Sequence, residues 1–320
     1  ALPISADLYP GNAKTDARDA FVIADTARTM PHTLRRVDAG EETLAELKVL
    51  VGFDEDLAAE ATRLSNRIRG LLTQIHPALE RVVGPRLTTK QGLAVIEQLG
   101  GPQAMAAASK SKLLRVISKA YPRGTQEFAD AITTALAEQT VIVAGTAAAE
   151  QVLPQLAASL RQTLDQRHAL AAQIEQVVDA HPLAEVLTSM PGVGVRTAAR
   201  ILLDVGDASQ FPTAGHLAAY AGLAPVTRRS GTSIRGEFPA RSGNKHLKRA
   251  LFLSAFAALR SDPTSKAYYD RKRAQGKKHN AALICLSRRR CDVLFAMLKN
   301  REPYRAPTPT REPSPLPLAA

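Results

Sequence analysis

The sequence predicts a mainly α-helical protein, and two observations carry that prediction. Leucine, isoleucine and valine recur at three- and four-residue steps over long stretches of the 320-residue chain, which is the spacing of one helix face. Aromatic residues make up only 4% of the chain and tryptophan is absent. An Ala-rich composition of this kind favours packed helices over a large sheet.

The first elements are a short helix and a long one. Segment 1–12 is rich in turn residues, and Thr15 or Asp16 is the expected N-cap of the helix that follows. Strong helical periodicity then runs over 41–83, whereas 84–123 has the Gly and Pro breaks expected of several short helices.

A second long helical stretch covers 125–180. Gly52 and the acidic cluster 54–56 weaken the middle of the stretch at 41–83, but the pattern still allows one long helix. We expect these two stretches to pair as an antiparallel coiled-coil arm, although packing within a simple bundle would explain the same periodicity.

The C-terminal third holds shorter elements. We expect a helical hairpin over 181–207 and a short helix over 211–222, followed by an irregular polar loop over 224–243. Two basic helices are predicted at 244–259 and 265–299.

Charge is distributed unevenly along the chain. Residues 1–227 carry 21 Lys and Arg against 24 Asp and Glu, a net of −3, whereas 228–305 carry 20 against 5, a net of +15. Such an excess is typical of polyanion binding, because each contact with a nucleic-acid phosphate releases condensed counterions. The alternative is a solvated basic face kept for solubility.

Other features exclude several classes of protein. No apolar run reaches the length needed to span a bilayer, and no signal peptide pattern opens the chain, so we expect a cytoplasmic protein associated with the bacterial nucleoid. Cys285 and Cys291 are expected to be small apolar groups rather than a disulfide or metal pair, and no histidines have metal-ligand spacing.

A glycine-rich turn between two apolar segments matches a helix-hairpin-helix. Its residues are Pro191, Gly192, Val193 and Gly194. The glycines permit a tight turn, and the free amides that open the second helix can donate to a phosphate. Arg196 and Arg200 are expected to add contacts, although such a turn can also be a simple helix connector.

One serine stands among arginines. Ser230 precedes a glycine and follows the segment GLAP at 222–225; the nearby arginines are Arg228, Arg229, Arg235 and Arg241. Serine needs activation to act as a nucleophile, and arginines can hold a scissile phosphate and offset its charge in the transition state. Taken from the residues alone, Ser-Gly is a turn.

Asp16 and Asp19 lie at i and i+3, on one face of the first helix. Such a pair can contribute oxygen ligands to Mg²⁺, as phosphoryl transfer requires. The alternative is favourable acidic charge at a helix N-terminus.

These motifs in this order, followed by RSGNKHLKRALFLSAFAAL and YYDRKRAQGKKHNAALICLSRRRCDVLFAMLKN, resemble one family. It is the insertion-sequence transposases that combine a RuvC-like DEDD domain with a serine-bearing C-terminal domain, some of which are recombinases guided by a bridge RNA. The resemblance extends from Asn12 to about Tyr304.

The resemblance implies roles for individual residues. Asp16 and Asp19 match the last two acids of the Mg²⁺-binding DEDD set. Ser230 matches the serine that attacks DNA and forms a phosphoserine link. The partners implied are DNA (the element ends and the target), a guide RNA, and further copies of the chain in a homodimer or tetramer, with no membrane. The nucleic-acid-binding candidates are Gly192, Val193, Gly194, Arg196, Arg228, Arg229, Arg235, Arg241, Lys245, Lys248 and Arg249.

The chain departs from the family in one respect. The first Asp and the Glu of the family should lie upstream of Lys14, on a part of the α/β domain of about 80 to 100 residues that this chain lacks. Asp7 is too close to Asp16 to replace either acid. Because the chain starts without Met, we expect a fragment. Because two carboxylates alone hold Mg²⁺ poorly, we expect this fragment to be inactive by itself. Ser233 and Ser242 lack the sequence context of Ser230.

The resulting expectation is a DNA transposase or recombinase with four parts. They are a remnant of the RNase H-like DEDD domain (1–40), a helical coiled-coil region (41–180), a transposase domain with the helical hairpin and serine loop (181–302), and a disordered Pro-rich tail (303–320). The alternatives are an inactive nucleic-acid-binding relic or dimerising inhibitor of the intact transposase, and a junction-binding repair protein.

Overall fold

A computed structural model describes residues 15–30, 42–139, 141–230 and 234–306. The described chain is mainly helical and contains one two-stranded sheet, so the predicted fold class is confirmed. None of the described helices is both long and apolar enough to cross a membrane.

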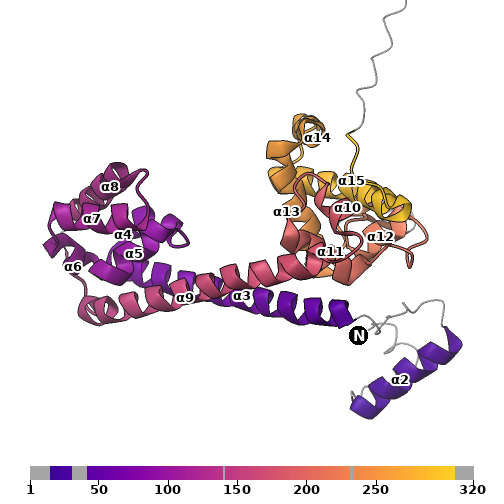
Figure 1. The fold of residues 1–320 in the computed structure, drawn as a ribbon, viewed down its shortest axis with the longest axis horizontal. Coiled ribbons are helices and arrows are strands. Elements are labelled where there is room, and N and C mark those ends of the chain that lie inside the picture. Colours follow the sequence, from indigo (N-terminus) through magenta and orange to yellow (C-terminus); the bar gives the residue numbers. More distant parts are fainter. Residues whose placement is uncertain (1–14, 31–41, 140, 231–233, 307–320) are drawn as a thin grey trace, which may run out of the picture.

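The longest elements of the described chain are two antiparallel helices of 34 residues each, α3 (Glu42–Ile75) and α9 (Thr146–Asp179). Figure 1 shows them lying side by side along the longest axis. Leu47 at the start of α3 shares a core with Val178 at the end of α9, whereas Leu72 shares another with Leu153. The pairing predicted from periodicity is therefore confirmed, while its supercoiling stays a prediction.

The distal lobe packs on the C-terminal half of α3 and the N-terminal half of α9. Its elements are α4 (Pro77–Val83), η2 (Gly84–Arg86), α5 (Lys90–Leu99), α6 (Pro102–Ala107), α7 (Lys110–Ala120) and α8 (Thr125–Glu138). His76 separates α3 from α4 and caps α4, because its Nδ1 accepts the amide of Leu79 at 3.1 Å.

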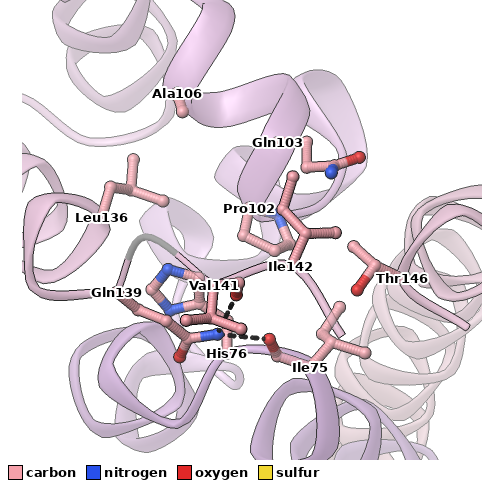
Figure 2. A pocket seen from close by; sticks show the side chains of 10 residues that line it. All are labelled: Ile75, His76, Pro102, Gln103, Ala106, Leu136, Gln139, Val141, Ile142 and Thr146. Atoms are coloured by element: carbon pink, nitrogen blue, oxygen red, sulfur yellow. Dashed lines mark hydrogen bonds between the residues drawn. The ribbon is translucent and has the colours of Figure 1, made fainter. Parts of the chain in front are cut away.

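Figure 2 shows a small pocket in the distal lobe, with a volume of about 190 Å³. The amide of Gln139 donates to the carbonyls of Ile75 (2.8 Å) and Val141 (3.1 Å) across one wall of this pocket. None of the residues predicted to bind nucleic acid or to act in catalysis lines it.

The C-terminal lobe packs on the other halves of α3 and α9. Its helices are α10 (Ala184–Thr188), α11 (Val195–Val205), α12 (Ala214–Tyr220), α13 (Lys245–Ser261), α14 (Pro263–Ala274) and α15 (His279–Asn300). One core cluster joins the first half of α3 to these helices. The domain boundary expected at residue 180 thus lies within a continuous core, and the division into domains stays a prediction.

Two element predictions were wrong. The expected loop at 224–243 contains an antiparallel hairpin, β1 (Val226–Ser230) and β2 (Ile234–Phe238), in the register Val226↔Phe238 to Ser230↔Ile234. The strand signal in the sequence is weak, because Val226 is the one apolar residue of β1 and Gly236 stands at the centre of β2. The single helix expected at 265–299 is two, α14 and α15, separated at Gly276, whose φ is +81°.

The long stretches predicted from periodicity also divide. The helix expected over 41–83 ends at Ile75 and resumes at Pro77, and the stretch at 125–180 is α8 followed by α9. The acidic cluster at 54–56 does not interrupt α3, because Asp54 is buried against arginines of the C-terminal lobe.

The cysteines are unpaired thiols on α15. Cys291 is buried and Cys285 is half-buried, and burial raises the pKa of the Cys291 thiol to about 12. A thiol of that pKa stays protonated and unreactive at neutral pH.

Candidate nucleic-acid and catalytic site

The predicted glycine turn joins two helices as expected. Helix α10 ends at Thr188, and Gly194 is the N-cap of α11. Gly192 has a φ of +80°, and a Cβ there would meet the amide of Ala258 on α13 at 2.7 Å. Gly194 is exposed, and a Cβ there would have no atom within 4 Å. The turn therefore rests on α13 through Gly192 and presents Gly194 to solvent.

A buried arginine holds this turn from behind. The guanidinium of Arg290 donates to the carbonyl of Pro191, to Ser254 Oγ (2.8 Å) and to Ser265 Oγ (3.4 Å). Ser265 in turn donates to Asp262 at 2.5 Å. Burial lowers the pKa of Arg290, and the negative charge of Asp262 acts in the opposite direction. This network, which we call the Arg290 network, ties α13, α14 and α15 to the turn.

Arg196 and Arg200 are occupied by carboxylates of α3. Arg196 Nε lies 3.1 Å from Asp54, which also pairs with Arg167 of α9 at 3.0 Å. Arg200 lies 2.6 Å from Glu55. In this arrangement the two arginines join the lobe to the long helix pair, so the expected phosphate contacts of Arg196 and Arg200 stay predictions.

The serine hairpin stands on a narrow base. Gly222 (φ +65°) and Gly243 (φ +101°) lie against each other, and a Cβ on Gly222 would meet the carbonyl oxygen of Ser242 at 2.5 Å. Asn244 closes this base through its amide to the Tyr220 carbonyl (2.7 Å) and its side chain to the Tyr220 hydroxyl (3.0 Å). We call this base the glycine neck.

The hairpin projects from the glycine neck. Ser230 is the last residue of β1, and Arg229 pairs with Arg235 across the two strands. The side chains of Arg228, Arg229, Ser230 and Arg235 lie outside the described set, as does Ser233. The backbone register alone thus brings Ser230 and two arginines to one end of the hairpin.

The remaining basic candidates follow the glycine neck. Lys245 and Arg249 are exposed on the first turns of α13, and Arg241 is exposed just before it. Lys248 is half-buried and donates to the carbonyl of Ala240 at 3.2 Å. Lys245, Lys248 and Arg249 have the i, i+3, i+4 spacing of one helix face.

The acidic pair lies in the first turn of α2 (Asp16–Thr29), with Thr15 as the N-cap. Thr15 Oγ1 accepts the amide of Arg18 at 3.3 Å, and Asp19 donates its amide to the Thr15 carbonyl. Asp16 is exposed and Asp19 half-buried. No group of three or more His, Cys, Asp or Glu capable of holding a metal occurs among the described residues. Asp7 lies outside them. Two carboxylates alone do not satisfy the six-ligand geometry of Mg²⁺.

Family models match both ends of the chain. The model described as "Transposase IS116/IS110/IS902 family" matches residues 184–270, and a model of a DEDD transposase matches residues 3–77. The 43.6 kDa protein of insertion element IS110 from Streptomyces coelicolor is 58% identical over 304 residues, which are 95% of this chain and 75% of that protein. The chain belongs to this transposase family.

Two further relatives agree along the same span. The 42 kDa protein of insertion element IS900 from Mycobacterium paratuberculosis is 36% identical, over 96% of this chain and 76% of that protein. The 44.8 kDa protein of IS116 from Streptomyces clavuligerus is 34% identical, over 95% and 76%. A transposase acts on DNA, which accounts for the basic C-terminal third.

Three features of the C-terminal lobe were not predicted from the sequence. The Arg290 network and the glycine neck join residues far apart in the chain, and neither has a local pattern. A cluster of aromatic rings around His279 was also missed, although tyrosines beside a basic run were a visible signal.

Proposed function

We propose that this transposase cuts and rejoins DNA strands through Ser230. The hydroxyl oxygen attacks the phosphorus of a phosphodiester, the Ser230 proton departs, and a DNA hydroxyl leaves as a phosphoserine ester forms. Attack by the hydroxyl of a second strand reverses the step and restores the serine. Each step exchanges one phosphate ester for another, so no nucleotide hydrolysis is needed.

The observation that supports this proposal is the glycine neck with its hairpin. The glycine neck holds the base of the β1–β2 hairpin, and Ser230 is the last residue of β1. Arg229 is paired with Arg235 in the register next to it. Arginines so placed can bind the attacked phosphate and stabilise its additional charge in the transition state. The turn at Gly192–Gly194, with Lys245 and Arg249, would grip the neighbouring DNA backbone.

The acids complete the proposal only in part. We assign Asp16 and Asp19 to a Mg²⁺ site to which further oxygen ligands must contribute, because two carboxylates supply only part of the six-ligand shell of Mg²⁺. We also propose a guide RNA and a homodimer or tetramer as partners of the intact protein.

The test is Ser230→Ala in a full-length, strand-exchanging form, with Ser242→Ala as its control in the same segment. Strand exchange and the SDS-resistant DNA–protein adduct should fall at least about a thousandfold with Ser230→Ala, while DNA binding persists. Ser242→Ala should leave both near the wild-type level. Exchange retained in Ser230→Ala overturns the serine role.

The second candidate function is a binding protein without catalysis, such as an inhibitor of the intact transposase. The exposed Lys245 and Arg249 of α13 favour it, because they can bind a phosphate backbone whether or not a strand is cut. It predicts salt-sensitive DNA binding by the chain and no covalent adduct, even when Mg²⁺ is supplied.

A further inference from the structure

Three aromatic rings meet where α13, α14 and α15 converge. His279, the first residue of α15, lies edge-on to Phe256 of α13 (centroids 6.3 Å apart, 87°) and to Tyr269 of α14 (5.7 Å, 79°). The Tyr269 hydroxyl and His279 Nδ1 are hydrogen-bonded at 2.6 Å, which fixes the two rings. We call these three residues the ring cluster.

The ring cluster is open to solvent. Phe256 is 45% exposed, His279 is exposed and Tyr269 is half-buried. The three helices are joined beneath it by buried residues such as Ala255, Ala258 and Leu283 together with the Arg290 network. The Phe256 ring is therefore not needed to hold the helices together, and with the rings of Tyr269 and His279 it leaves aromatic surface available for stacking.

Basic residues are concentrated on α14 and in the turn after it, the segment that carries Tyr269 and leads to His279. Between residues 263 and 278 there are six basic residues against one acid, Asp270, which is neutralised by Lys266 at 2.6 Å. The other five are Arg271, Lys272, Arg273, Lys277 and Lys278, and none of them forms an ion pair within the described chain. Arg271 and Lys272 lie 5.1 and 5.6 Å from the ring centre of the neighbouring Tyr268.

This combination recognises a specific ligand chemistry. Unpaired cations attract phosphates, and an exposed ring stacks on a base, but only a base that is not already stacked inside a duplex. We propose that the ring cluster and the cations of α14 bind unpaired nucleotides of a single-stranded nucleic acid. The inference rests on the proposed nucleic-acid function and adds a second site to it, on elements other than the α10–α11 turn and the serine hairpin.

The variants that test the proposal are Phe256→Leu and His279→Leu, which keep apolar volume and remove a stacking surface. Leu253→Ala is the matched control, because Leu253 lies one turn earlier on α13 and is similarly exposed, at 49%. Fluorescence anisotropy on the whole chain would compare oligo-dT, oligo-U and a DNA duplex of equal length. Circular dichroism and urea unfolding would confirm that all variants fold alike.

We expect each of the two ring variants to weaken single-strand binding about tenfold, the size of one lost base stack, with duplex binding and Leu253→Ala unchanged. A loss confined to oligo-U identifies RNA as the ligand, and a loss confined to oligo-dT identifies a DNA strand. Unchanged single-strand binding in both ring variants, or an equal loss for duplex, overturns the stacking proposal.

Binding of the three probes by the wild-type chain distinguishes a failure of this inference from a failure of the proposed function. Binding of duplex DNA that is insensitive to the ring variants contradicts the ring cluster alone. Failure of the wild-type chain to bind any of the three probes contradicts both.

Discussion

The two turns of the C-terminal lobe are held in opposite ways. The turn between α10 and α11 rests on α13 through Gly192 and is fixed from behind by Arg290. The β1–β2 hairpin leaves the lobe at the glycine neck, and Val226 and Phe238 at its base are 41% and 43% exposed. A surface that grips DNA gains from rigidity, because no ordering cost is paid on binding. A nucleophile that must work with a second set of groups gains from projecting away from its core.

The largest expected loss of stability comes from Arg290→Met, which releases the turn between α10 and α11. The change removes the hydrogen bonds of Arg290 to the Pro191 carbonyl and to the hydroxyls of Ser254 and Ser265. It also removes the positive charge that acts on buried Asp262, and buried groups left unsatisfied in this way cost about 1–3 kcal/mol each. Urea unfolding measures the loss. Arg289→Met is the control, because Arg289 is exposed at the next position and should cost no more than about 0.5 kcal/mol. Equal midpoints for the two variants would contradict the buttressing role.

Gly192→Ala should have the next largest effect. The positive φ and the clash with the backbone of α13 together cost about 2–4 kcal/mol. Gly194→Ala is the matched control for stability, because its Cβ enters open space. If phosphates approach the Gly194 backbone, that methyl group should still weaken DNA binding, which a filter-binding titration against salt would show.

Gly222→Ala separates the two turns functionally. It strains the glycine neck at a φ of +65° and should cost about 1–3 kcal/mol. In a full-length active form, misplacement of the hairpin should lower strand exchange about a hundredfold, with DNA affinity nearly unchanged. Gly236→Ala in β2 should be mild, since the nearest atom is in the movable ring of Phe238, at 3.3 Å. A parallel loss of DNA affinity in Gly222→Ala would show that the two turns are coupled.

The smallest expected effect is a pH dependence of the Arg290 network. Burial raises the pKa of Tyr304, and Asp262 raises it further. Because the folded pKa exceeds the unfolded value, the stability from neutral Tyr304 is complete below about pH 10 and falls as pH rises beyond it. Unfolding midpoints across this range should fall more steeply for the wild type than for Tyr304→Phe. Cys291 contributes in the same direction to both proteins, so identical slopes would show that Tyr304, which interacts with Asp262 of the Arg290 network, does not affect stability.

Local patterns predicted what depends on local physics. The Thr15 cap, the pairing of α3 with α9 and the glycine turn were all visible, since capping, periodicity and turn chemistry act over a few residues. The β1–β2 hairpin was missed, because β1 holds a single apolar residue and Gly236 interrupts the alternation of β2.

Contacts between distant residues were not predictable in this way. Asp54 pairs with Arg167 and Arg196, more than a hundred residues away, and the acidic cluster at 54–56 therefore gave the impression of a weak helix. The roles predicted for Ser230, Asp16 and Asp19 came from the family resemblance, and no local pattern would have supplied them.

The α3–α9 pair also sets a length. A helix of 34 residues extends about 51 Å at 1.5 Å per residue, and B-DNA advances 3.4 Å per base pair. The Asp54 ion pairs fix the α3–α9 helices to the C-terminal lobe, so the distal lobe is held at a constant distance from that lobe. On a duplex parallel to the pair, the length of one of these helices corresponds to about 15 base pairs, or one and a half helical turns.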